Sequence, residues 1–180
     1  MKMVTGTQNT HVLFADSEKF YFLGQSGQQV SPDALLGKVI CLLYGAGWSP
    51  PFLEFLSLFK RFYSELESDH APLQVIYVSF DRTREEMREL VSHFPASWVS
   101  LPHSSSLINY LKLKHSVVVI PRLVVVKDNG ELITDKGVRD VRKRVKRCFT
   151  SWYNAAKILP VGQGTETNPV NQGAALNPAS

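Results

Sequence analysis

The stretch from Lys38 to Phe80 constrains the fold more than any other part of this 180-residue chain. It begins with an apolar run bounded by glycines, Lys38–Tyr44, and ends with a second run, Leu73–Phe80. Apolar runs of this length are typical of strands that are buried on both faces. Between them, apolar residues spaced by three and four positions predict one long helix: Phe52, Phe55, Phe59, Phe62 and Leu66. Two buried strands joined by such a helix form a parallel crossover, which predicts an α/β protein.

The remaining sequence adds further helices and a hairpin to this unit. Helical patterns are found over residues 83–94 and 106–113, with a helical turn over 33–36. A final helix is predicted over 138–158, with an inner face made of Val138, Val141, Val145, Phe149 and Trp152. Short strands are predicted at 12–14, 20–23, 123–126 and 131–134, and Asp128-Asn129-Gly130 is typical of the turn between the last two. The order of elements predicts a central mixed sheet in a three-layer α/β/α arrangement.

The composition indicates one domain with polar ends. Residues 1–10 are predicted to be a flexible N-terminus, 11–159 the folded domain, and 160–180, which lack periodicity, a disordered tail. No apolar run approaches the ~20 residues of a membrane helix, and the N-terminus lacks the apolar core of a signal peptide. We therefore expect a cytoplasmic protein that does not cross a membrane. Entry into the nucleus, or release without a signal peptide, are the alternatives.

Several segments at the expected places carry a resemblance to one family. They are Trp48-Ser49-Pro50-Pro51-Phe52 between strand and helix, Leu73–Asp81, Ser97–Pro102, Ile120-Pro121-Arg122-Leu123, Val124–Gly137 and Cys148–Trp152. The first resembles the thioredoxin-fold active site, in which Trp-Cys-x-x-Cys begins a helix, and its Pro-Pro pair is similar to the tryparedoxin and nucleoredoxin branch. The C-terminal third resembles the nucleoredoxin-like proteins, also called rod-derived cone viability factors. The resemblance covers about residues 10 to 158 and implies a thioredoxin fold.

The resemblance also implies where the site lies and what it lacks. Ser49 stands where the nucleophilic cysteine would be, and Phe52 where the resolving cysteine would be. A serine hydroxyl forms no disulfide, so neither residue is expected to be catalytic and the chain is not expected to be an enzyme. Ile120–Pro121 matches the cis-proline site of the fold. A peptide groove is then implied, formed by Trp48, Pro50, Pro51, Ile120 and Pro121.

Other catalytic or metal-binding arrangements are not indicated. Ser49 is a better helix N-cap than a hydrolase nucleophile, because no histidine lies near it in sequence. The five histidines have no triad or metal-ligand spacing: His11, His70, His93, His103 and His115. No cofactor or metal is expected. Cys41 and Cys148 are the only cysteines, and buried reduced thiols are the plain interpretation.

Positive charge is concentrated in one short segment. The net charge is +4, while residues 139–147 alone carry +5, from Arg139, Arg142, Lys143, Arg144, Lys146 and Arg147 against one aspartate. These residues predict the solvated face of an amphipathic helix, or a surface for an acidic protein, an anionic lipid, nucleic acid or nuclear import. Nucleic acid is disfavoured, since no aromatic platform or binding motif accompanies them.

Two classes of function remain. The first is a redox-inactive thioredoxin-like protein with a protein or peptide partner, and the resemblance implies a binding or trophic role in the maintenance and survival of sensory neurons such as photoreceptors. The second is a weak thiol–disulfide oxidoreductase or redox sensor that uses Cys41 or Cys148. Thiol reactivity of the folded protein separates the two classes.

Overall fold

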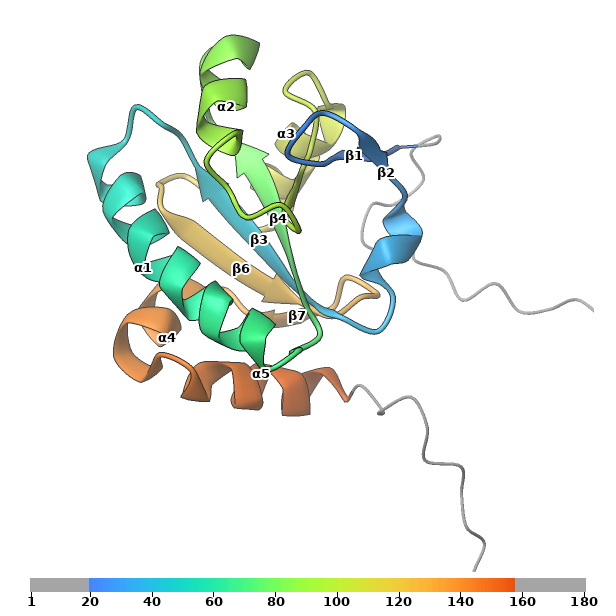
Figure 1. Cartoon of the computed structure of the whole chain (residues 1–180), viewed down its shortest axis with the longest axis vertical. Helices are drawn as coiled ribbons and strands as arrows, with labels where there is room; N and C mark the ends of the chain where they lie inside the picture. Colours follow the sequence, from blue (N-terminus) through green and yellow to red (C-terminus); the bar gives the residue numbers. More distant parts are fainter. Residues whose placement is uncertain (1–19, 158–180) are drawn as a thin grey trace, which may run out of the picture.

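A computed structural model describes residues 20–157 of the chain. These residues form a mixed sheet in the order β2-β1-β5-β4-β3-β6-β7. The strands are β1 (Phe22–Leu23), β2 (Gln29–Val30), β3 (Val39–Gly45), β4 (Leu73–Ser79), β5 (Val99–Ser100), β6 (Arg122–Val126) and β7 (Leu132–Thr134). The helices are the 3₁₀-helix η2 (Pro32–Leu35) and α1 (Pro50–Ser68), α2 (Arg84–Val91), α3 (Ser106–Lys114), α4 (Gly137–Arg144) and α5 (Arg147–Ala156) (Figure 1).

Strand β3 lies in the interior of the sheet. It pairs in parallel with β4, from Val39 opposite Leu73 to Gly45 opposite Ser79, and antiparallel with β6. Every residue of β3 and of β4 is buried, as their continuous apolar sequence predicts. The parallel crossover expected between residues 38 and 80 is therefore confirmed.

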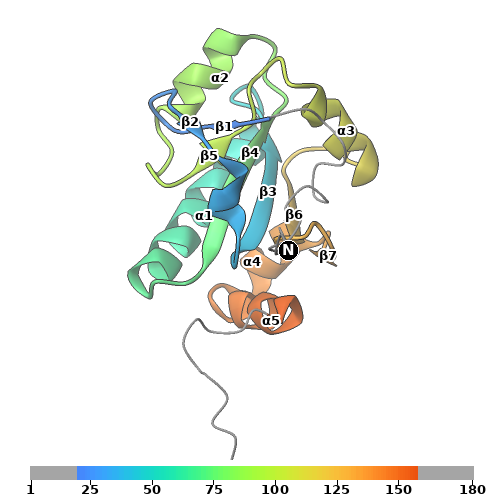
Figure 2. The ribbon, with the colours of Figure 1, turned by 90° about the vertical axis from the view of Figure 1, so that its right-hand side faces the viewer.

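The two faces of the sheet pack into separate cores, which confirms the three-layer arrangement. Val39, Cys41 and Leu43 face a core shared with α1, α2, α4 and α5. The alternate residues Ile40, Leu42 and Tyr44 face a second core with η2 and α3. This alternation follows from the two-residue period of a strand. Figure 2 shows α1 and α3 on opposite sides of β3.

The long helix α1 begins where its sequence predicts. The Ser49 side chain is the N-cap and accepts a hydrogen bond from the Phe52 N–H, and proline occupies the first helical position. The apolar stripe predicted for this helix is buried along its whole length: Phe52, Phe55, Phe59, Phe62 and Leu66. A tilted ring contact joins Phe59 to Trp98, and a T-shaped one joins Phe62 to Trp152. This packing places α1 against the sheet along its buried face.

The single helix predicted over residues 138–158 is wrong, because the chain breaks it into α4 and α5. At Val145 the backbone turns to φ 44°, ψ −130°, a conformation that β-branched residues rarely adopt. Val145 is 42% exposed instead of lying on the inner face. Val141 of α4 and Trp152 of α5 are both buried in the α1 core, so packing sets two helix directions. Figure 1 shows the two helices meeting at an angle.

Other differences from the predicted elements are small. The two-residue strands β2 and β5 are too short to leave a periodic pattern. Both pair antiparallel with β1. The predicted strand at 12–14, the flexible residues 1–10 and the tail 160–180 lie outside the described residues, as do both ends of the 11–159 domain. Within residues 20–157, no helix is long and apolar enough to cross a bilayer.

Candidate functional site

The residues predicted to form the groove meet at one end of the sheet. Arg122, at the start of β6, pairs with Tyr44, near the end of β3. Because these two strands are antiparallel, the loop after β3 and the segment before β6 meet at the same edge. The first carries Trp48 and Ser49, and the second carries Ile120–Pro121, whose peptide bond is cis as the resemblance implies.

The positions that correspond to a redox dithiol hold a capping hydroxyl and a packed ring. Ser49 is 5% exposed, and among the described residues its hydroxyl has one partner, the Phe52 N–H at 3.4 Å. Within residues 20–157, no histidine forms a hydrogen bond with this hydroxyl, as a base that activates a serine nucleophile would. Phe52 is fully buried, with its ring centroid 6.1 Å from that of Tyr77. The arrangement therefore caps and packs the start of the helix.

Gly45, the last residue of β3, makes room for the Phe52 ring. A Cβ atom added at Gly45 would lie 2.0 Å from Phe52 Cε2 and 2.4 Å from its Cζ. Non-bonded carbons pack at about 3.5–4.0 Å, so a side chain at 45 and the ring at 52 exclude each other. Nothing in the sequence pattern indicates this pairing, because the two residues lie on different elements.

The rest of the predicted groove remains open to solvent. Trp48 is 47% exposed, and Pro50 and Pro51 are exposed, while Ile120 and Pro121 are half-buried. The indole Nε1–H of Trp48 donates to the Phe80 carbonyl at 3.2 Å. The Arg82 guanidinium lies 5.3 Å from the centre of the indole. The site thus keeps an ordered aromatic surface although it has no thiol.

A buried carboxylate supports the loop that carries Trp48. Asp81 is 7% exposed; its Oδ1 accepts from the Gly47 N–H at 2.7 Å, and its Oδ2 from the hydroxyls of Tyr77 and Ser79 at 2.7 Å each. Burial, followed by the nearby Asp81 charge, raises the pKa of Tyr77 and keeps it a donor. In the sequence, Asp81 stands out only as the last residue of the segment Leu73–Asp81, and nothing local indicates this positioning role.

Both cysteines are buried in the α1 core, on β3 and α5. Cys41 is 0% exposed and Cys148 1%, and both are free thiols. Burial is the main cause that raises the pKa of Cys41 well above its usual value, with the nearby Cys148 adding to it. Burial raises the pKa of Cys148 to about 12, and Asp140 contributes. Thiols of this kind are poor nucleophiles, since the thiolate is the reactive form.

The histidines of the described residues belong to no metal-binding cluster. His11 lies outside the described residues. Across residues 20–157, no group of three or more His, Cys, Asp or Glu side chains is arranged to hold a metal. His115 instead ends α3, with its Nδ1 2.9 Å from the Tyr44 hydroxyl. Burial is the largest cause that lowers the pKa of His115 to about 4.

Acid should therefore destabilise the fold through His115. Its pKa is lowered on folding, so the unfolded chain binds the extra proton between about pH 6.5 and pH 4. The stabilisation is complete above pH 6.5 and is lost as pH falls toward 4. Because the ring is partly exposed, we expect about 1–2 kcal/mol. Urea unfolding of wild type and His115→Gln at pH 7 and pH 4.5 measures it; an equal loss in both proteins would contradict the assignment.

The six basic residues predicted as one face are all exposed, but the structure divides them into three sets. Lys146 forms an ion pair with Asp69 at the end of α1. Arg144 and Arg147 flank the break between α4 and α5. Arg139, Arg142 and Lys143 line a cavity of about 350 Å³ together with Pro121. The structure thus joins part of the basic face to the cis-proline segment, although the sequence treats them as separate surfaces.

A second, wider cavity lies toward the β2 edge of the sheet, beside β1 and β5. It measures about 650 Å³ and lies between the β1–β2 turn, α2 and the segment after β5. Its ionisable lining is mixed, with Arg84 and Arg88 beside Glu85 and Glu89. None of the residues predicted as functional lines it.

Comparison with known proteins decides the family. A sequence profile described as thioredoxin-like matches residues 37–132. The chain belongs to the thioredoxin-like family. Nucleoredoxin-like protein 1 of Homo sapiens is 30% identical over 130 residues, which are 69% of this chain and 61% of that protein. Probable nucleoredoxin 1 of Arabidopsis thaliana is 31% identical over 144 residues, 78% of this chain and 24% of that protein.

Solved structures of thioredoxin-like proteins share this fold. Thioredoxin from Wuchereria bancrofti superposes with a TM-score of 0.64 at 33% identity, covering 77% of this chain and 96% of that one. Tryparedoxin II from C. fasciculata gives a TM-score of 0.68 at 24% identity, covering 76% and 91%. With its nucleoredoxin-like relatives, the chain fits the nucleoredoxin-like branch of the family. It spans about 60% of the length of those relatives.

Proposed function

We propose that this thioredoxin-like chain binds an extended segment of a partner protein without dithiol chemistry, in the maintenance and survival of sensory neurons such as photoreceptors. The observation that carries the proposal is the packed Phe52 ring at the position of the resolving cysteine, beside the capping hydroxyl of Ser49. A segment held at this site forms no mixed disulfide, so binding rests on surface contacts alone.

The exposed surface of Trp48, Pro50 and Pro51 supports the binding part of the proposal. Trp48 presents an ordered ring, and Pro50 and Pro51 extend that surface along the start of α1. Aromatic rings combine a large apolar area with few rotatable bonds, and so they are frequent binding anchors. The neuronal part rests on the likeness to nucleoredoxin-like proteins. For the compartment we propose the cytoplasm, with the nucleus or release from the cell as the alternatives.

A weak oxidoreductase or redox sensor is the competing function. It would depend on Cys41 or Cys148, which are the only thiols of the chain. Burial and the raised pKa of each leave little thiolate at neutral pH. Neither thiol lies in the groove segment beside Trp48. The binding function is therefore the better supported of the two.

Retinal explants that express the chain test both functions at once. Survival of photoreceptors should be unchanged by Cys41→Ala with Cys148→Ala, and should fall to the level of untreated tissue with Trp48→Ala. Leu132→Ala is the matched control, because Leu132 is 53% exposed at the opposite end of the sheet. Loss of survival in the folded double cysteine variant would favour the redox function. No survival effect of the wild-type chain would contradict the neuronal role.

A further inference from the structure

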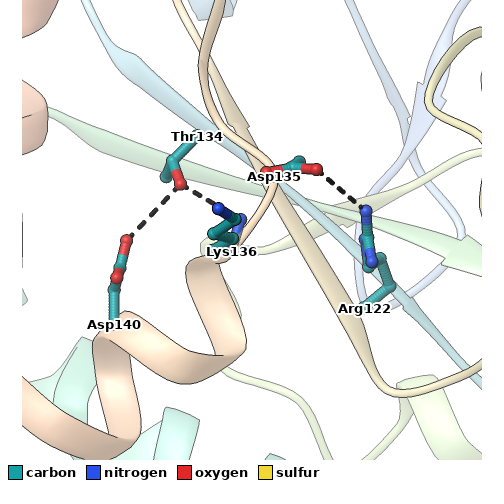
Figure 3. Close-up of polar contacts among 5 residues, drawn as sticks. All are labelled: Arg122, Thr134, Asp135, Lys136 and Asp140. Atoms are coloured by element: carbon teal, nitrogen blue, oxygen red, sulfur yellow. Dashed lines mark hydrogen bonds and ion pairs between the residues drawn. The ribbon is translucent and has the colours of Figure 1, made fainter.

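The cavity beside the cis-proline lies between two segments that are distant in sequence. Pro121 and Arg122 form one side, and the turn at Asp135–Lys136 with one face of α4 forms the other. Figure 3 shows Arg122 reaching Asp135 in this turn, while Thr134 contacts Lys136 and Asp140. The Thr134 hydroxyl accepts from the Lys136 N–H at 3.0 Å. These contacts fix the turn, so the cavity has an ordered floor.

Charge in this cavity is strongly one-sided. Its lining holds five cationic side chains and a single carboxylate: Arg122, Lys136, Arg139, Arg142 and Lys143 against Asp135. Asp135 is already paired with Arg122 at 3.2 Å. Within residues 20–157, no carboxylate lies within ion-pair distance of the other four cations. The Arg142 guanidinium rests 5.9 Å from the centre of the Phe55 ring and is held at the cavity edge.

An apolar surface continues from the cavity along the same segment. Val118 and Val119 are 86% and 65% exposed and lie immediately before Ile120–Pro121. An extended segment that follows residues 118–121 would therefore meet apolar side chains first and the cationic cavity next. Its complement is a segment in which apolar residues adjoin Asp or Glu.

We propose that an acidic segment of a partner protein binds along residues 118–121. An Asp or Glu side chain of that segment is seated in the cavity between Pro121 and α4. The inference rests on the proposed function and specifies the chemistry of its partner. Carboxylate and guanidinium groups form strong, charge-assisted hydrogen bonds. The positive charge of Arg139, Arg142 and Lys143 therefore favours segments that carry Asp or Glu.

The shape of the basic surface favours a peptide over a lipid headgroup layer. Membrane-surface helices present a continuous cationic face beside an apolar one. Here the helix breaks at Val145, and Lys146 is paired with Asp69. Arg139, Arg142 and Lys143 of α4 line a cavity of about 350 Å³, a volume within the range of small-molecule pockets.

Binding to immobilised decapeptides under reducing conditions tests the inference. The peptides carry two Glu, two Gln or two Lys at varied positions among Val, Leu and Ser. We expect the best Glu peptides to bind about tenfold more tightly than their Gln counterparts at low salt, and the difference to shrink as salt screens the charges. Arg139→Glu with Lys143→Glu should remove this preference; these exposed side chains are chosen because Arg142 also packs on Phe55.

Arg144→Glu with Arg147→Glu is the matched control, since it makes the same charge change outside the cavity. It should retain the Glu preference, with Arg139→Gln and Lys143→Gln as a milder cavity variant if the first does not fold. Equal binding of Glu and Gln peptides by wild type would overturn the inference and leave the proposed function standing. Failure of all three peptide classes would count against the proposed function itself. Equal losses in cavity and control variants, or binding only to phosphatidylserine vesicles, would also overturn the inference.

Discussion

Phe52→Ala should lower the free energy of unfolding by about 3–5 kcal/mol, as expected when a large buried ring is removed from a core. The ring is fully buried between Gly45 and Tyr77. Its loss leaves a cavity at the start of α1 that the backbone of β3 cannot close. Urea unfolding followed by circular dichroism measures the change. A loss below about 1 kcal/mol would show that the ring is not a core element.

Gly45→Ala should be as harmful as the loss of the ring while Phe52 is present, because its methyl group would lie 2.0 Å from Phe52 Cε2. In Gly45→Ala with Phe52→Ala the methyl group enters the vacated space, so the combined loss should be smaller than the sum by about 1–3 kcal/mol. Gly47→Ala is the matched control, since its nearest neighbour would be 3.6 Å away. Strict additivity at 45 and 52 would contradict the proposed exclusion.

Ser49→Cys should make this site reactive toward disulfides. The new thiol would lie at the N-terminus of α1, where the helix dipole lowers a thiol pKa from about 8.5 into the range of roughly 3.5–7.5. Its thiolate should therefore attack oxidised glutathione at neutral pH, forming a mixed disulfide and releasing one reduced glutathione. Phe52 offers no second thiol, so that disulfide should persist until a reductant is added.

Mass spectrometry after exposure to oxidised glutathione detects this adduct. Wild type provides the background, because the pKa values of Cys41 and Cys148 are raised by burial. An adduct on wild type that matches the one on Ser49→Cys would show that a buried thiol is accessible. No adduct on the folded variant would show that the capped position is closed to partners.

Local sequence patterns predict the elements whose neighbours are close in the chain. The apolar runs of β3 and β4 and the stripe of α1 are such cases, because burial on both faces or on one face leaves a period that can be counted. The cap at Ser49 is also local. The resemblance correctly places the cis peptide bond at Pro121.

Features that depend on distant contacts leave no such trace. The break at Val145 has no glycine or proline to announce it, since the packing of Val141 and Trp152 against α1 sets it. The fit of Gly45 to Phe52 and the support of Gly47 by Asp81 join different elements. For the same reason, the sequence separates the basic run from Pro121, and only the fold brings Arg139 and Arg142 to its side.

Reduction of insulin disulfides tests the loss of dithiol chemistry most directly. The reference is Gly45→Ala with Ser49→Cys and Phe52→Cys, in which two thiols occupy the site and the methyl group fills the space of the ring. With dithiothreitol as the reductant, this variant should accelerate insulin precipitation above the blank. The wild-type chain should match the blank, with or without Cys41 and Cys148. Wild-type acceleration that survives Cys41→Ala and Cys148→Ala would contradict the account.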